Sequence, residues 1–156
     1  MRILRLLASW LLAIFLIGLY LHLTIHPWPS PAVGHVQLYD LPGENILFAT
    51  LAERSGYVMF EPTGRFFVAI AELITAFLLL LPITRRVGAF FSCLIMFGAI
   101  GLHMSPWLDR ELPLSLSSGD AATDGGALFA LTIAMLVASI LVLVAHPSRR
   151  NSARYY

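Results

Sequence analysis

Residues 66–82 read FFVAIAELITAFLLLLP, and after the turn ITRR residues 87–106 read VGAFFSCLIMFGAIGLHMSP. Both runs consist mainly of apolar residues, and each is about as long as the 17–25 residues that cross a bilayer as a helix. Because the turn between them is so short, the two helices must lie side by side and antiparallel. This pair of runs therefore predicts a helical hairpin that spans a membrane.

Two further apolar runs, residues 3–25 and 126–146, complete a set of four. The first run is longer than the apolar region of a signal peptide, so we expect it to remain as an anchor. Of the 156 residues, 58% are hydrophobic and 12% charged, against about 45–50% and about 25% in a soluble domain. The sequence predicts an all-α membrane protein, a single integral membrane domain built as a four-transmembrane-helix bundle.

The segments between the runs differ in character. Residues 26–64 form a long outer loop, whose second half places apolar residues at helical spacing and then reaches Gly56 as a stop signal. This pattern predicts a short amphipathic or re-entrant helix after the first span. The outer loop 107–125 is rich in proline, glycine and serine, and residues 147–156 form a polar tail.

The charges predict the orientation of the chain, because arginines concentrate in cytoplasmic segments. Seven arginines and no acid flank one side: Arg2, Arg5, Arg85, Arg86, Arg149, Arg150 and Arg154. The other side has Arg54, Arg65 and Arg110 with eight acids: Asp40, Glu44, Glu53, Glu61, Asp109, Glu111, Asp120 and Asp124. We expect both termini to be cytoplasmic. The net charge of +1 gives no basic surface for nucleic acid.

Small residues indicate where helices approach closely in lipid. In the fourth run they recur every four residues and predict a stripe that faces a neighbouring helix: Gly126, Ala130, Ala134 and Ala138. The third run has Gly88, Ser92 and Ala99 toward one side. These seven residues are the predicted helix-packing positions.

Glu72 is the only charged residue inside an apolar run. Burying a carboxyl group in a bilayer is costly, so such residues face the interior and find partners. His103 and His22 are expected in the same outer leaflet, which makes all three ligand-binding candidates. A structural role is the alternative, with Glu72 bonded to His103, Thr75 or a carbonyl group. We expect Glu61 and Arg65, four residues apart, to form an ordinary surface pair.

Other chemistries find little support in the sequence. Cys93 is the only cysteine, so the chain has no internal disulfide or thiol-exchange pair. No histidine spacing of a metal site is present, and we expect no metal. His22 and His103 on two helices could in principle ligate a haem, but no further feature of a haem site accompanies them, and we do not expect one. The sequence contains no complete catalytic constellation.

The stretch from residue 62 to residue 89, with Met96, the GA pair at 98–99 and His103, resembles the DoxX and DoxX-like family of small bacterial four-helix membrane proteins. The shared features are a glycine before the second span, an intramembrane glutamate, a proline with a basic turn, and a span that ends with small residues and a histidine. The resemblance implies an inner-membrane bundle with an outer hairpin or half-helix. It also implies functional positions at Glu72 and His103. Some family members resemble the membrane subunit of thiosulfate:quinone oxidoreductase, and others accompany redox or thiol-stress proteins.

Two functions follow as hypotheses. The first is a non-enzymatic accessory subunit of a membrane redox or respiratory assembly, which contacts the bilayer and other membrane subunits. The alternative is a quinone- or lipophile-binding component of an oxidoreductase, in which Glu72 and His103 handle protons. A small transporter is a third hypothesis, but four helices are too few for the usual inverted repeats unless the chain oligomerises.

Overall fold

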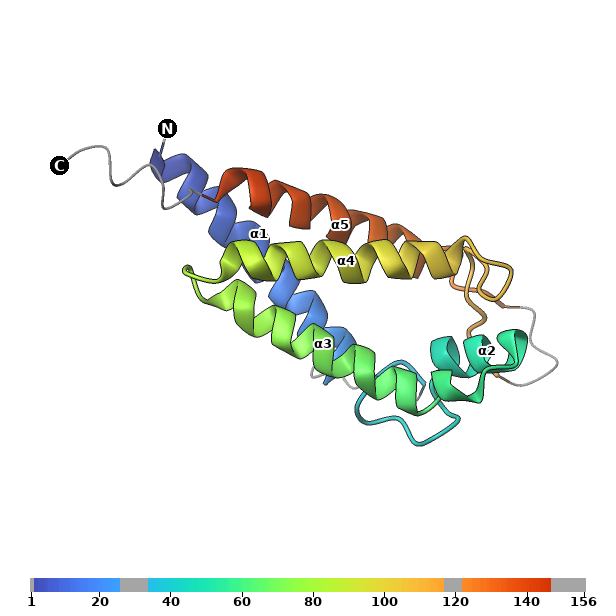
Figure 1. Ribbon diagram of the computed structural model, residues 1–156. Helices are drawn as coiled ribbons and strands as arrows, with labels where there is room; N and C mark the ends of the chain where they lie inside the picture. Colours follow the sequence, from blue (N-terminus) through green and yellow to red (C-terminus); the bar gives the residue numbers. More distant parts are fainter. Residues whose placement is uncertain (1, 26–33, 117–121, 147–156) are drawn as a thin grey trace.

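A computed structural model describes residues 2–25, 34–116 and 122–146 of the chain. These residues form five α-helices and one short 3₁₀-helix, and no β-strand occurs among them (Figure 1). The helices are α1 (Arg2–Thr24), α2 (Ile46–Ser55), η1 (Val58–Phe60), α3 (Thr63–Leu80), α4 (Arg85–His103) and α5 (Ala127–Ala145). The all-helical prediction is therefore confirmed for the described residues.

The four predicted spans correspond to α1, α3, α4 and α5, and each is long and apolar enough to cross a membrane. The largest differences in length are in the hairpin. Helix α3 begins at Thr63 rather than residue 66, and α4 ends at His103, where the sequence predicts a run to residue 106. The remaining short helix, α2, occupies the place predicted for a helix after the first span. The polar tail 147–156 lies outside the described residues.

All four long helices contribute to one apolar core. Its buried members are Leu16, Tyr20, Ala76, Leu79, Ala89, Met96, Met135, Ala138 and Val142. Polar atoms within this core are paired with one another. The Tyr20 hydroxyl lies 2.7 Å from Ser92 Oγ, which in turn lies 2.6 Å from Ser139 Oγ. This chain of hydroxyl groups ties α1, α4 and α5 together at mid-height.

Helices α3 and α4 meet most closely beside the turn that joins them. A Cβ atom on Gly88 would lie only 2.7 Å from the backbone nitrogen of Leu79. Only glycine permits this approach, so Gly88 is a true packing position. From here the two helices diverge, and α2 lies between their separated ends (Figure 1). We call the end with the α3–α4 turn the turn end, and the opposite end the loop end.

Only part of the small-residue stripe of the fourth span is buried against other helices of the chain. Ala138 is buried, whereas Ala130 and Ala134 are exposed and Gly126 is the left-handed residue that precedes α5. Four residues of an α-helix turn by 40° more than a full circle, so a four-residue repeat drifts around the helix. The inward face of α5 is formed instead by Thr132, Met135, Ala138, Ser139 and Val142.

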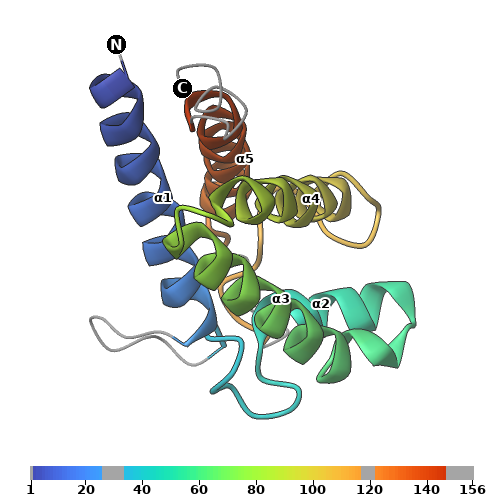
Figure 2. The same ribbon diagram turned by 60° about the vertical axis from the view of Figure 1, so that its left-hand side comes forward.

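Helix α2 has well-defined ends. The Asn45 side chain accepts a hydrogen bond from the backbone nitrogen of Phe48, and Gly56 closes the helix in the left-handed conformation. The apolar face of α2 packs on the segment after α4, where Leu108 and Leu112 are buried. Figure 2 shows α2 beside the beginning of α3. The 34–45 segment and α2 thus close the loop end.

Candidate functional site

A cavity of about 800 Å³ lies at the loop end, where α3 and α4 have separated. Its walls come from all four long helices, from the 34–45 segment and from α2. Most of the lining is apolar, and the polar lining side chains are His22, His35, Gln37, Asn45, Glu72, His103 and Thr132. The volume is in the range of about 300–1,000 Å³ that is usual for small-molecule sites.

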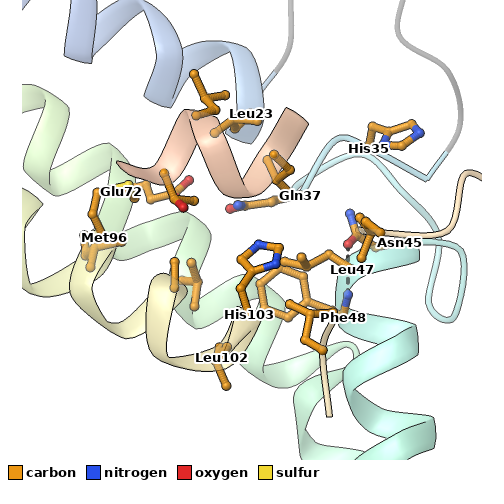
Figure 3. Close-up of a pocket in the computed structure, with 18 of the residues that line it drawn as sticks. Leu23, His35, Gln37, Asn45, Leu47, Phe48, Glu72, Met96, Leu102 and His103 are labelled. Atoms are coloured by element: carbon orange, nitrogen blue, oxygen red, sulfur yellow. Dashed lines mark hydrogen bonds between the residues drawn. The ribbon is translucent and has the colours of Figure 1, made fainter. Parts of the chain in front are cut away.

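Glu72 lies in the wall of this cavity and is almost fully buried, with 3% of its surface exposed. Its Oε2 atom accepts a hydrogen bond of 2.8 Å from the hydroxyl group of Thr24. The side-chain amide of Gln37 points toward the Glu72 carboxyl group (Figure 3). The sequence suggested His103 or Thr75 as partners, but the structure supplies side chains from α1 and from the loop instead.

Gln37 is a site residue that the sequence analysis missed. Its backbone nitrogen donates to the carbonyl oxygen of Leu23 at 3.2 Å, and its own carbonyl oxygen accepts from Arg65. These two bonds fix the loop against α1 and α3, and so aim the side chain at Glu72. The Gln37 Oε1 atom is buried and has no hydrogen-bond partner. No pattern in the sequence marks this loop position.

Arg65 also differs from its predicted role. Its Nε atom donates to both carboxylate oxygens of Glu61, at 3.0 and 2.9 Å. The side chains of this pair are 0% and 4% exposed, so it is a buried ion pair and not the ordinary surface pair that we expected. The reason is that the 34–45 segment covers the start of α3. The guanidinium group thereby joins the loop to the helix that holds Glu72.

His103, at the end of α4, lies in the cavity wall and is 3% exposed. Its Nδ1 atom lies 3.0 Å from the carbonyl oxygen of Asp109, and its ring contacts Phe129 with 5.6 Å between centroids. A carbonyl group only accepts hydrogen bonds, so Nδ1 must hold a proton. In the neutral imidazole Nε2 is then the acceptor.

The structure thus brings the three predicted site residues to one cavity. His22 lines it from the last turn of α1, and its side chain is exposed, unlike those of Glu72 and His103. Ala99, predicted as a packing residue, also lines the cavity. Ser92 is buried in the hydroxyl chain of the core. Thr24 and Gln37 are the additional residues that complete the surroundings of Glu72.

A second polar cluster lies at the turn end. Its buried side chains form hydrogen bonds with one another or with backbone carbonyl groups. His146 Nδ1 lies 3.0 Å from Ser9 Oγ, and its Nε2 lies 3.0 Å from the carbonyl oxygen of Pro82. Arg85 donates from Nε to the Leu79 carbonyl oxygen at 2.9 Å. Burial, together with the charges of Arg85 and Arg86, lowers the pKa of His146, although the Pro82 hydrogen bond acts in the opposite direction.

No group of three or more histidine, cysteine, aspartate or glutamate side chains in the described part of the chain is placed to hold a metal ion. The cavity instead combines apolar walls with a carboxyl group, an imidazole and a primary amide. This arrangement can bind a lipophilic molecule with a polar head and exchange protons with it. Comparisons of the chain with protein-family models, curated proteins and solved structures find no match.

Proposed function

We propose that the chain binds a quinone-like lipophilic molecule in the loop-end cavity, with Glu72 and His103 as its proton-exchanging groups. The observation that carries the proposal is the common position of these side chains in the wall of an apolar cavity of about 800 Å³. Reduction of a quinone takes up protons as well as electrons, so an acid and a base beside the head group suit this ligand. Electrons would come from a partner protein, which makes the chain one component of a membrane oxidoreductase.

The same proposal includes the setting of the chain. We place it in a bacterial inner membrane as a DoxX-like protein, with the turn end on the cytoplasmic side. In support, Arg5 and Arg86 lie at the turn end, where they donate to the carbonyl oxygens of Val144 and Leu143. The acidic side chains of Asp109 and Glu61 lie at the loop end. This distribution follows the excess of arginine on cytoplasmic surfaces.

Binding of a decyl-substituted benzoquinone and its quinol to the protein in lipid nanodiscs tests the proposal. Calorimetry in buffers of different ionisation enthalpy measures how many protons accompany binding. We expect the wild-type protein to bind and to exchange protons with solvent. Glu72→Gln keeps an acceptor for Thr24 but removes the titrating group, so it should bind with an altered proton count. Glu53→Gln, on the exposed surface of α2, is the matched control.

His103→Gln provides the second arm of this experiment, since glutamine can still donate to the Asp109 carbonyl oxygen but does not titrate. The proposal is wrong if the wild-type protein binds neither form, or if both variants match the wild type in affinity and proton count. A visible spectrum of the purified protein decides separately whether a haem is present.

An accessory role is the second candidate, and the exposed Ala130 and Ala134 on α5 favour it. Small residues on a lipid-facing surface allow another helix to approach. Cross-linking in native membranes should yield a heteromeric product that Ala134→Phe removes. Ile133→Phe changes a neighbouring exposed position and should leave the product unchanged. The absence of a cross-linked product from both the wild-type protein and Ile133→Phe would contradict this role.

A further inference from the structure

The divergence of α3 and α4 leaves a seam between two helices that are both exposed on their outer sides. The helices approach most closely at Gly88, and α2 lies between their separated ends at the loop end (Figure 1). Between these two points, the cavity is lined by Val68 from α3 and by Ile95 and Gly98 from α4. The seam is therefore a part of the cavity wall that also belongs to the apolar outer surface of α3 and α4.

Gly98 occupies a special position in this wall. It lines the cavity and is also exposed, and a Cβ atom at this residue would meet nothing within 4 Å. Its neighbours Leu94 and Phe97 are 52% and 72% exposed, as expected for side chains that face lipid. At Gly98 the wall between cavity and exterior consequently has no side chain.

Polar and apolar side chains both line the cavity. Glu72, Gln37 and His103 are buried in its wall (Figure 3), while the lining residues at the seam, Val68, Ile95 and Gly98, are apolar. A ligand that matches this pattern has one polar head and one apolar chain. The polar part pairs with buried hydrogen-bonding groups, and the chain lies where apolar surface is removed from water.

We propose that the ligand is a long-chain membrane amphiphile whose head binds beside Glu72 and His103. Its chain leaves the cavity through the α3–α4 seam, past Gly98, into the bilayer. This inference rests on the proposed function, because it requires that the cavity binds a lipophile. It adds the position of the ligand's chain and the route by which the ligand is exchanged. The head reaches the buried polar groups from within the membrane, and the chain never has to enter water.

A glycine pair on α4 allows a matched test. Gly98 and Gly101 are both exposed, and a Cβ atom at either position meets nothing within 4 Å, but only Gly98 lines the cavity. Gly98→Phe should place a ring in the path of the chain, and Gly101→Phe should place one in lipid. Binding is measured in nanodiscs for two benzoquinones with the same head, one with a decyl chain and one with a methyl group.

We expect Gly98→Phe to weaken binding of the decyl compound about tenfold, the effect of displacing about two buried methylene groups. Binding of the methyl compound should not change, which also shows that the variant is folded. Gly101→Phe should affect neither compound. Equal effects of the two variants on the decyl compound, or equal weakening of both compounds by Gly98→Phe, would overturn the seam while leaving the proposed function intact. A wild-type protein that binds neither compound overturns both.

Discussion

The two ends of the molecule, the turn end and the loop end, are packed in opposite ways. At the turn end, backbones touch at Gly88, and Ser9, Arg85 and His146 are bonded to one another or to carbonyl groups. At the loop end, the helices separate around a cavity. The two buried side-chain atoms without a partner in the described part of the chain, Gln37 Oε1 and Arg65 Nη2, both lie there. Close packing and matched partners thus mark the structural end, and open space with unmatched polar atoms marks the end that can bind a ligand.

The largest expected effect tests how far the loop end depends on one buried ion pair. Arg65→Met leaves the Glu61 carboxylate buried and uncompensated, so we expect a loss of about 3–5 kcal/mol in the free energy of unfolding. Thermal unfolding of the purified protein measures the change. Arg54→Met breaks the exposed pair with Asp109, whose side chains are 40% and 69% exposed, and should cost at most about 1 kcal/mol. Similar losses in both variants would contradict the contrast between the pairs.

The next effect concerns the tight contact at the turn end. Gly88→Ala forces a Cβ atom against the backbone of α3 and should destabilise the protein by about 1–3 kcal/mol, the usual cost of overpacking. Gly101→Ala, on the same helix with open space around it, should be neutral or slightly stabilising. If Gly88→Ala unfolds at the wild-type temperature, the helices are not pinned at this point.

A smaller effect is expected where α5 begins, at the loop end. Asp124 Oδ1 accepts hydrogen bonds from the backbone nitrogens of Leu112 and Gly126, and Oδ2 accepts one from Leu128. Asp124→Ala should lower the free energy of unfolding by about 0.5–2 kcal/mol, as loss of a helix cap does. Glu53→Ala, on the exposed face of α2, provides the control, with an expected change near zero. An equal response of both variants would show that Asp124 does not hold the helix start.

The smallest expected effect is a difference in how the stability of the two ends depends on pH. The lowered pKa of His146 means that the unfolded chain takes up a proton first as the pH falls. The contribution of neutral His146 to the free energy of unfolding should therefore be fully present above the ordinary histidine pKa of about 6.5. It should be lost as the pH falls below that value. His146→Asn should remove this part of the pH dependence of the unfolding temperature. An unchanged profile would show that another group is responsible.

Asp124 at the loop end should respond only in stronger acid. Burial raises the pKa of its carboxyl group, but the hydrogen bonds from Leu128, Gly126 and Leu112 outweigh this effect, and the net pKa is lowered. Its contribution is present above the ordinary aspartate value of about 3.9 and is lost as the pH falls further. Asp124→Asn should reduce the loss of stability below about pH 4, and should leave the profile near about pH 6 unchanged.

The sequence predicted what depends on one-dimensional patterns. Apolar runs of sufficient length predicted the four long helices, and residues 45–56 predicted α2 because helical spacing of apolar residues and the stop at Gly56 are local signals. The lone carboxyl group of Glu72 stood out for the same reason. The sequence predicted Glu72 and His103 in one leaflet, and in the structure both side chains line one cavity.

Contacts that depend on the path of a loop could not be predicted from the sequence. Gln37 lies in the same cavity wall as Glu72 because the 34–45 segment folds back on α1 and α3, and no local pattern encodes that return. The burial of the Arg65–Glu61 pair was not predicted for the same reason, since it comes from the covering loop. The four-residue repeat on α5 drifts around the helix, so only Ala138 of the predicted stripe is buried within the chain, and Ala130 and Ala134 are exposed.

The position of α2 has a consequence for engineering the cavity. Leu47 and Phe48 line the cavity from α2, which lies between the separated ends of α3 and α4 (Figure 1). A substitution that changes the size of either side chain should therefore change the volume open to a ligand, without a substitution in any of the four long helices.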